Sequence, residues 1–147
     1  MKSKLLSMMT ASAFIFSVGI SSNAMAAGKA VTLKISANDQ MKFDKSELTV
    51  PADSQVTVEL ENKGGALQHN WVLTLPGKAM AVANESVSAG PSQNYLKKGP
   101  NVIANTKLAD PHKKVKVTFK APKKGTYDYI CTFPGHGVMM KGKFVVK

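Results

Sequence analysis

Apolar and polar residues alternate along several short stretches of the chain, and this period of two constrains the fold more than any other feature. The clearest stretches are residues 31–35, 56–60 and 115–119. Alternation of this kind places the apolar side chains on one face of an extended strand. Clusters of turn-forming residues separate the stretches, at residues 62–65, 98–101 and 122–125. The pattern therefore predicts an all-β sandwich or barrel of seven or eight strands.

One long segment interrupts this pattern. Residues 78–95 are rich in Ala, Ser, Asn and Gly and show little alternation. We expect this segment to form a long crossover or flap, with a helical turn or two at residues 79–84. No repeat or low-complexity linker divides the rest of the chain, so the sequence indicates one domain.

The N-terminus has the features of an export signal. Two lysines precede an apolar stretch at residues 11–20, and Ala24-Met25-Ala26 provides a small-residue cleavage site. The apolar stretch is shorter than the roughly 20 residues that a membrane-spanning helix needs, which argues against the alternative of a membrane anchor. We therefore predict a cleaved signal peptide at residues 1–26 and a mature domain at residues 27–147, without a transmembrane segment and located in the periplasm.

The chain is strongly basic, because 20 lysines face nine acidic residues and arginine is absent. Arginine is the residue suited to bidentate contacts with phosphate and guanine, so its absence and the export signal argue against a nucleic-acid partner. The lysines alternate along predicted strands, as at residues 113–117, instead of forming a helical stripe. We interpret them mainly as a solvated surface. Their field would also speed association with an acidic partner or an anionic membrane surface.

The segment from Cys131 to Met140 holds three kinds of metal-binding side chain within ten residues. Cys131 is the only cysteine of the chain, so it cannot form an internal disulfide. His136 follows it by five residues, and two methionines follow at Met139 and Met140. A thiolate, an imidazole and a thioether are soft or borderline ligands, and together they point to copper.

His69 is the candidate for a second imidazole ligand. Alternation places it on the same face as Trp71, and an inward histidine of this kind is more often a core residue than a ligand. Cys131, however, ends another predicted strand and points inward with Tyr129. Two strands would then deliver an imidazole and a thiolate to one end of the core. With His136 and a long thioether contact, they would form the ligand set of a blue copper site.

Zinc binding and cysteine-based catalysis are the alternatives for this cluster. Structural zinc sites close with four Cys or His ligands, and a neutral methionine is a poor donor to zinc, although zinc would still be able to occupy the site. A nucleophilic thiolate needs a nearby base and access for a substrate. A two-histidine site capped by methionine offers no obvious pocket, so we expect no enzymatic activity.

With these motifs the chain resembles the cupredoxin family of type 1 (blue) copper proteins, in particular its azurin-like and auracyanin-like members. The resemblance covers the mature domain and rests on three segments: HNWVL at residues 69–73, NYLKKGPNVIANTKL at 94–108, and CTFPGHGVMMKG at 131–142. It implies a cupredoxin-like Greek-key β-sandwich of about eight strands. It also implies one copper ion per chain that alternates between Cu(I) and Cu(II).

The resemblance implies a ligand set as well. The equatorial ligands would be His69, Cys131 and His136. The family spacing of four residues between Cys and His and three between His and Met selects Met140 as the axial ligand, with Met139 as the competitor at the surface. The remaining histidine, His112, is expected in an exposed loop and not at the metal.

Three further residues gain expected roles from the resemblance. The carbonyl oxygen of Gln68, directly before the first histidine, would be a distant fifth contact. Asn70 and Thr132 match residues that tie the two ligand loops together and donate hydrogen bonds near the thiolate. Ordinary turn capping is the alternative role for this pair.

These features predict a periplasmic one-electron carrier between respiratory redox proteins, such as a cytochrome, a copper nitrite reductase, an oxidase or a dehydrogenase. We expect a monomer that docks transiently near His136, through residues Ala66, Leu67, Pro134, Val138 and Met139. The alternative function is copper storage or delivery, for which exposed clusters of Met or His are more typical. A basic exported binding module without a metal would leave the ligand set unexplained.

Overall fold

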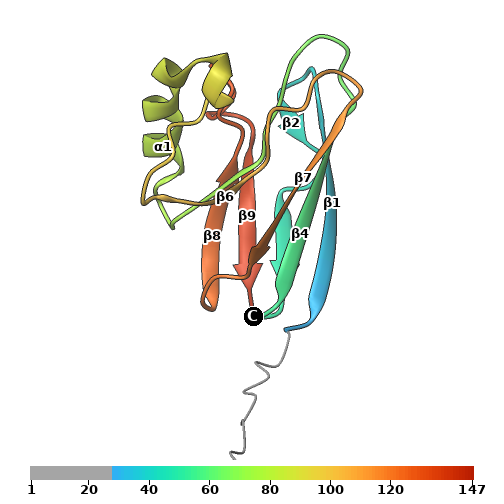
Figure 1. Cartoon of the computed structure of the whole chain (residues 1–147), viewed down its shortest axis with the longest axis vertical. Helices are drawn as coiled ribbons and strands as arrows, with labels where there is room; N and C mark the ends of the chain where they lie inside the picture. The colour runs from blue at the N-terminus through green and yellow to red at the C-terminus, as the bar shows by residue number, and fades with distance from the viewer. Residues whose placement is uncertain (1–27) are drawn as a thin grey trace, which may run out of the picture.

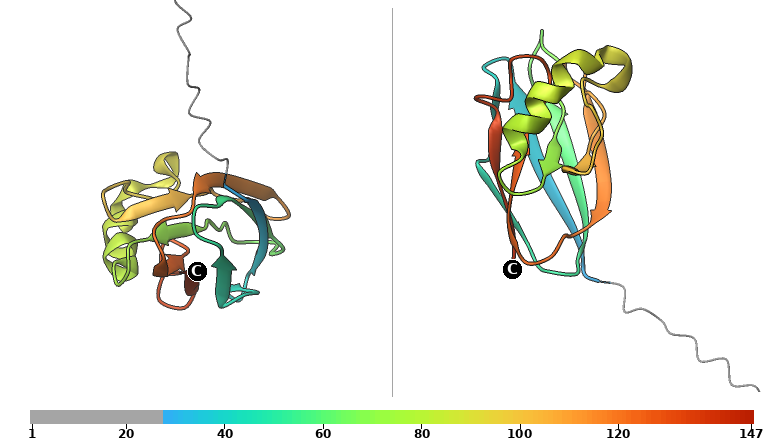
Figure 2. Two further views of the ribbon diagram at one scale, coloured as in Figure 1. Left: turned by 90° about the horizontal axis from the view of Figure 1, so that it is seen from below. Right: turned by 90° about the vertical axis from the view of Figure 1, so that its left-hand side faces the viewer.

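Two β-sheets pack face to face in the computed structural model, which describes residues 28–147 (Figure 1). The first sheet contains, in spatial order, β2 (Lys42–Phe43), β1 (Ala30–Asn38), β4 (Gln55–Asn62) and β7 (Lys114–Lys120). The second contains β3 (Glu47–Val50), β9 (Lys141–Val146), β8 (Gly125–Ile130), β5 (Val72–Thr74) and β6 (Val102–Asn105). Seen from below, the strands enclose a common interior (Figure 2, left). The predicted β-sandwich of about eight strands is confirmed, since the described part of the chain forms nine strands.

The N-terminal prediction lies beyond this structure. The signal peptide expected at residues 1–26 falls outside the described residues, so its cleavage stays a prediction. Between Gly28 and the C-terminus, the structure holds no helix that is long and apolar enough to cross a membrane.

The central strand of the first sheet, β4, shows how alternation produces the core. Val56, Val58 and Leu60 point inward and are fully buried, as the period of two predicts. On the outer face, Glu59 lies between Lys34 of β1, its parallel neighbour, and Lys116 of β7, its antiparallel neighbour. Opposite charges on neighbouring strands favour this register. The inward residues of β4 thus form part of the core, while its outward charges help to align it with its neighbours.

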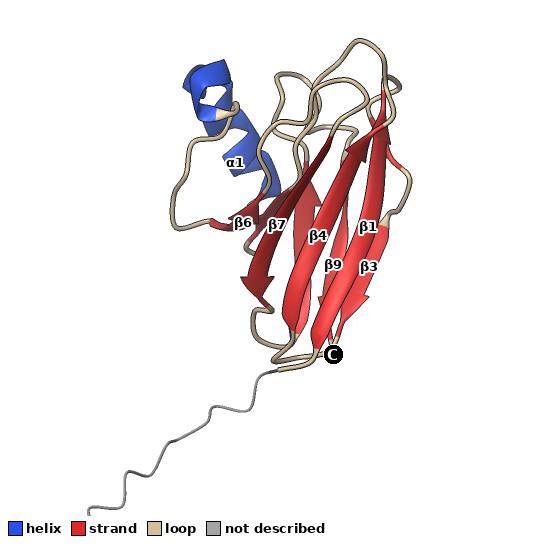
Figure 3. Ribbon diagram, turned by 45° about the vertical axis from the view of Figure 1, so that its right-hand side comes forward, coloured by secondary structure: helices blue, strands red, loops and turns tan. Residues whose placement is uncertain are grey.

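The flap between β5 and β6 is largely helical. It contains α1 (Ala79–Ser86) and two 3₁₀ turns, η1 (Val87–Ala89) and η2 (Pro91–Gln93). The helix expected at residues 79–84 is therefore confirmed and extends two residues further. Figure 3 shows α1 outside the sandwich, next to β6, and the right-hand view of Figure 2 shows it in front of the strands.

Helix α1 covers the outer face of the second sheet, and this changes the burial of the strands beneath it. Val72 of β5 and Ile130 of β8 point outward but pack against Val82 of α1 and Leu96. All three residues of β5 are buried as a result. A strand that is buried on both faces can carry apolar residues on either side, and Val72 is accordingly apolar although it lies on the outer face.

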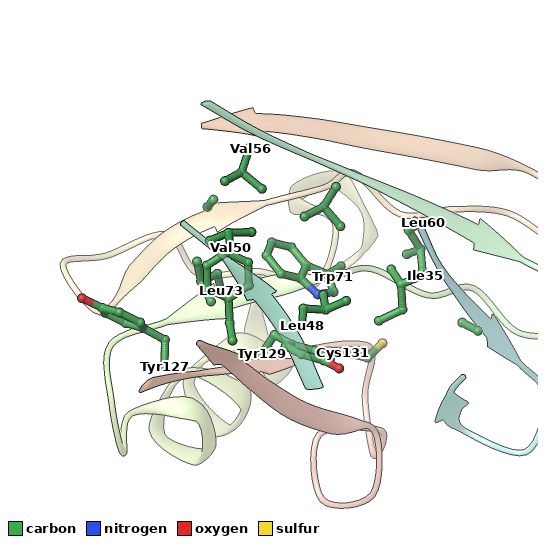
Figure 4. Packing of buried hydrophobic residues seen from close by; sticks show 14 of the residues in the cluster. Ile35, Leu48, Val50, Val56, Leu60, Trp71, Leu73, Tyr127, Tyr129 and Cys131 are labelled. Carbon is green, nitrogen blue, oxygen red and sulfur yellow. The ribbon is translucent and has the colours of Figure 1, made fainter. Parts of the chain in front are cut away.

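The main core is centred on the aromatic side chain of Trp71 (Figure 4). Its ring lies 6.0 Å from that of Phe119, 5.7 Å from that of Tyr129 and 6.1 Å from that of Phe144, measured between centroids. Figure 4 also shows Cys131 beside Tyr129 at one end of this cluster. The packing of large apolar side chains therefore continues up to the first predicted ligand.

Tyr129 is fixed by contacts on two sides. Its hydroxyl donates a hydrogen bond of 2.6 Å to the carbonyl oxygen of Lys45. The backbone of Gly142 in β9 lies directly against its ring, where a Cβ atom would overlap the ring and approach the Ser46 carbonyl oxygen to 2.7 Å. This position therefore requires the absence of a side chain.

We predict that Gly142→Ala lowers the free energy of unfolding by about 1–3 kcal/mol, because the added methyl group overpacks a filled site. Urea unfolding followed by tryptophan fluorescence measures the change. Gly99→Ala is the matched control, since a Cβ atom at Gly99 meets nothing within 4 Å. Equal stabilities of the two variants would contradict the close contact between Gly142 and Tyr129.

Candidate metal centre

The predicted ligands come from two loops at the end of the domain opposite the C-terminus (Figure 1). The loop between β4 and β5 carries His69, and the loop between β8 and β9 carries Cys131, His136 and Met140. β5 and β8 are antiparallel neighbours, with Val72 opposite Ile130. The start of one strand and the end of the other therefore meet at the same end of the sandwich.

The backbone of His69 is held by a neighbouring segment. His69 and Ala109 form an isolated bridge, in which the His69 N–H donates to the Ala109 oxygen at 3.2 Å and the Ala109 N–H donates to the His69 oxygen at 2.7 Å. The buried side-chain amide of Asn62 donates to the carbonyl oxygens of Leu67 and Ala109, at 2.7 and 2.9 Å. The approach of the chain to His69 is thus fixed on both sides.

The second loop is a tight turn closed by its own backbone. The Cys131 N–H donates to the Met140 oxygen at 3.0 Å, and the Met140 N–H donates to the His136 oxygen at 2.8 Å. Gly135 has a φ of 82°, a left-handed conformation that glycine adopts without a steric penalty. These contacts hold the thiol, the imidazole and the methionine in one short loop.

The structure brings three of the predicted ligands together. The ligand atoms of His69, Cys131 and His136 all lie within 4.8 Å of one another. The Cys131 Sγ atom is 3.6 Å from the His136 Nδ1 atom. Among residues 28–147 this is the one group of three His, Cys, Asp or Glu side chains that could hold a metal ion.

The imidazole of His69 is buried without a hydrogen-bond partner. Its side chain is fully buried, yet neither Nδ1 nor Nε2 has a partner. In the described residues, the indole nitrogen of Trp71 is the only other buried side-chain nitrogen or oxygen in this condition. Unpaired buried polar atoms are costly and rare. Two of them on one ring indicate that this imidazole binds a metal ion or another ligand.

Burial also sets the protonation of the cluster. It lowers the pKa of His69 to about 4, with a further contribution from the nearby His136, and it lowers the pKa of His136. Burial raises the pKa of the Cys131 thiol to about 11, although the backbone N–H groups of Asn70 and Phe133 act in the opposite direction. At neutral pH both imidazoles are therefore free to donate to a metal ion, while the thiol must release one proton.

Asn70 and Thr132, the residues that follow His69 and Cys131, bond to each other. The Asn70 side-chain amide donates to the Thr132 hydroxyl at 2.8 Å, and the Thr132 N–H donates to the Asn70 side-chain oxygen at 2.8 Å. Asn70 donates also to the carbonyl oxygen of Asn94 at 3.0 Å. All atoms of the reciprocal pair are buried, so the pair joins the two ligand loops directly.

The two methionines of the loop are in opposite environments. Met140 is fully buried, while Met139 is 56% exposed. The prediction that Met139 lies at the surface is therefore confirmed. Met140 is the buried methionine of the ligand loop, and its role as a ligand stays a prediction.

Two other predicted residues lie outside the cluster. The Gln68 side chain reaches outward and donates to the Asp110 carboxylate at 2.5 Å. The contact expected from the Gln68 carbonyl stays a prediction. His112 is exposed, with a φ of 61°, and does not belong to the cluster, as expected.

Sequence analysis missed the residues that support the His69 loop. Asn62 occupies the next inward position after Val56, Val58 and Leu60, and a polar residue at such a position is a signal that was available. Asp39, which accepts hydrogen bonds from the same loop, carries no comparable signal, because it lies 26 to 28 residues from its partners.

The donor set fits copper better than zinc. Two neutral imidazoles and a thiol are already gathered in a dry site, and a buried thioether lies in the same loop. Blue copper sites combine these ligands. A structural zinc site would require a fourth Cys or His, and the part of the chain that the structure describes places no such residue in the cluster.

Comparisons with known proteins agree with this geometry. Residues 29–147 match a family described as copper binding proteins, plastocyanin/azurin family. Auracyanin-A of Chloroflexus aurantiacus is 48% identical over 120 residues, which cover 79% of this chain and 74% of the relative. Azurin-1 of Alcaligenes xylosoxydans xylosoxydans is 39% identical over 120 residues, which cover 76% of this chain and 93% of the relative. The solved structure of auracyanin A, a blue copper protein of Chloroflexus aurantiacus, has a TM-score of 0.77 at 47% identity and covers 80% of this chain and 99% of that one.

We predict that the metal-free protein loses stability as the pH falls from about 6.5 to about 4. The folded state holds His69 neutral in this window, whereas the unfolded chain binds a proton there, so acid favours unfolding. Titration of His69 should lower the free energy of unfolding by about 3 kcal/mol at the lower end of this pH window. Urea unfolding at several pH values, with a chelator present, measures it.

The variant His69→Gln should show a weaker dependence on pH, because the buried titrating group is gone. His112→Gln is the matched control, since the same exchange at an exposed loop residue should leave the pH dependence unchanged. If His69→Gln kept the full dependence, the acid sensitivity would arise elsewhere.

Proposed function

The chain belongs to the plastocyanin/azurin family of copper-binding proteins, and on this basis we propose that it is a periplasmic one-electron carrier with a single type 1 copper site. The observation that supports this function most directly is the buried cluster of His69, Cys131 and His136, in which both nitrogens of His69 lack a partner. The export features of residues 1–26 support the periplasmic location.

We propose His69, Cys131 and His136 as equatorial ligands, Met140 as the axial ligand and the Gln68 carbonyl as a weak fifth contact. When bound, copper supplies a one-electron couple between its cupric and cuprous states. Imidazole nitrogen suits the first state and soft sulfur suits the second, so this mixed set serves both. The bonds between Asn70 and Thr132, and those that close the second loop, hold the donors in place. Little rearrangement is then needed between the two states.

His136 connects the site to the surface. It keeps 3% of its surface exposed, whereas His69, Cys131 and Met140 are each at 0%. His136 is therefore the proposed ligand that a docked partner would reach most directly. We propose that the exposed or half-buried apolar residues of the two ligand loops form one apolar patch beside it, which we define as residues Ala66, Leu67, Pro134, Val138 and Met139.

The apolar patch suits short-lived docking. Val138 is 61% exposed and Met139 is 56% exposed. A shallow depression between α1 and the ligand loop continues the patch, and its lining includes Met80, Val87 and Val138. Small interfaces of this kind are typical of transient redox encounters. We propose redox proteins as partners, namely a cytochrome, a copper nitrite reductase, an oxidase or a dehydrogenase.

The visible absorption spectrum of the mature protein tests the function directly. After one equivalent of Cu(II), we expect an intense thiolate-to-copper charge-transfer band that ascorbate bleaches and an oxidant restores. Cys131→Ser should lack the band, since the sulfur is gone. A weak band in the wild-type protein, or none, would contradict the carrier and favour copper storage or delivery.

We predict that His136→Gly slows electron exchange by about tenfold or more and alters the visible band, because a ligand and its connection to the surface are both lost. Added imidazole should restore much of both properties by filling the space. Stopped-flow oxidation of the reduced protein by an inorganic oxidant measures the rate. The control is His112→Gly, an exposed histidine with a φ of 61° that glycine readily adopts. An unchanged rate in His136→Gly would exclude this route.

A further inference from the structure

Asp39 contacts the loop that leads to His69. It follows directly after β1, which ends at Asn38, and its carboxylate accepts hydrogen bonds from three consecutive backbone N–H groups. Oδ2 accepts from Gly65 at 2.7 Å, and Oδ1 accepts from Ala66 at 3.3 Å and from Leu67 at 3.1 Å. One side chain next to the first sheet thus binds three consecutive N–H groups of the turn between β4 and β5.

The bonds from Asp39 complement those from Asn62. Asn62 binds the carbonyl oxygen of Leu67 and accepts from the N–H of Gly64 at 2.9 Å, so it holds the inner side of the turn. Asp39 binds the three N–H groups of residues 65–67 from outside. Gly64 makes room for this arrangement, because a Cβ atom at that position would overlap the Asp39 carboxylate. Together the two side chains determine the path of the backbone up to His69.

The carboxylate is well suited to this position. The N–H groups of Gly65 and Leu67 lower the pKa of Asp39, so the group is ionised at neutral pH. Hydrogen bonds to an ionised acceptor are stronger than those between neutral groups. The side chain is also exposed, so the core does not depend on its packing. The hydrogen bonds that the structure shows for this side chain all come from the loop that leads to His69.

We propose that Asp39 is a positioning residue that fixes the His69 loop before the metal binds. The loop places His69 in the cluster two residues after Leu67, and it presents Ala66 and Leu67 in the apolar patch. A preset loop loses less conformational freedom on metal binding, which strengthens binding. This inference rests on the proposed role of His69 as a ligand.

Amide hydrogen exchange of the metal-free protein tests the positioning without copper. In Asp39→Ala, exchange at Gly65, Ala66 and Leu67 should be faster by about tenfold or more, since each loses a bond to a charged acceptor. Asp39→Asn can keep an oxygen at the Oδ1 position but places an amide at Oδ2. It should therefore accelerate exchange mainly at Gly65.

Asp53→Asn is the matched control. Asp53 is exposed, has a φ of 59° that asparagine tolerates, and lies 3.8 Å from Lys120 in a pair of exposed side chains. The Asp53→Asn variant should leave amide exchange in the His69 loop unchanged. Unchanged exchange at Gly65, Ala66 and Leu67 in both Asp39 variants would overturn the proposal.

Copper binding supplies the second measurement. We expect Asp39→Ala to weaken the affinity for Cu(II) about tenfold in competition with a chelator, and to shift the charge-transfer band, whereas Asp53→Asn changes neither. A loosened loop with unchanged affinity and spectrum would make Asp39 a purely structural residue and overturn the proposal. If the wild-type protein bound no copper, the proposed function would fail, and the exchange measurement alone would decide the role of Asp39.

Discussion

The antiparallel pairing of β5 with β8, with Trp71 packed against Tyr129, is the interaction on which the site depends. Trp71 lies two residues after His69, and Tyr129 lies two residues before Cys131, so the aromatic contact directs both ligands into the same end of the core. The same burial keeps the imidazoles neutral and the thiol protonated. A metal ion therefore meets donors that the fold has already gathered, and the only proton it must displace is that of Cys131.

A site of this kind costs stability, and the surrounding structure offsets the cost. The unpaired imidazole of His69 is destabilising in a dry core until a metal ion binds it. The bonds of Asn62, Asn70 and Thr132 are the compensating contacts, because each joins segments that are distant in sequence. Helix α1 adds a contact from outside, since a Cβ atom at Gly137 would lie only 2.8 Å from the Ala83 Cβ atom. Such support favours fixed ligands over easy release, as a carrier needs and a delivery protein does not.

Much of the fold could be predicted, because one face of most strands is buried and alternation records that burial. The grouping of Cys131, His136 and Met140 could also be predicted from the sequence, because all three residues lie in one short loop. The remaining features depend on contacts between distant segments. The strand β5 is covered on its outer face by α1, and the sequence did not predict this cover. Asp39 reaches Gly65 across 26 residues, and no periodicity in the sequence records a hydrogen bond of that span.

The lysines and the apolar patch contribute to different stages of an encounter. On the outer face of the first sheet, Glu59 and Glu61 lie opposite lysines of the neighbouring strands, so part of the positive charge is offset there. The surplus that remains acts at long range, and a field of this kind changes the rate of association more than the affinity. In the proposed docking, the apolar patch would act only at contact. A fast approach, brief contact and a rigid site are the three properties that rapid exchange of single electrons requires.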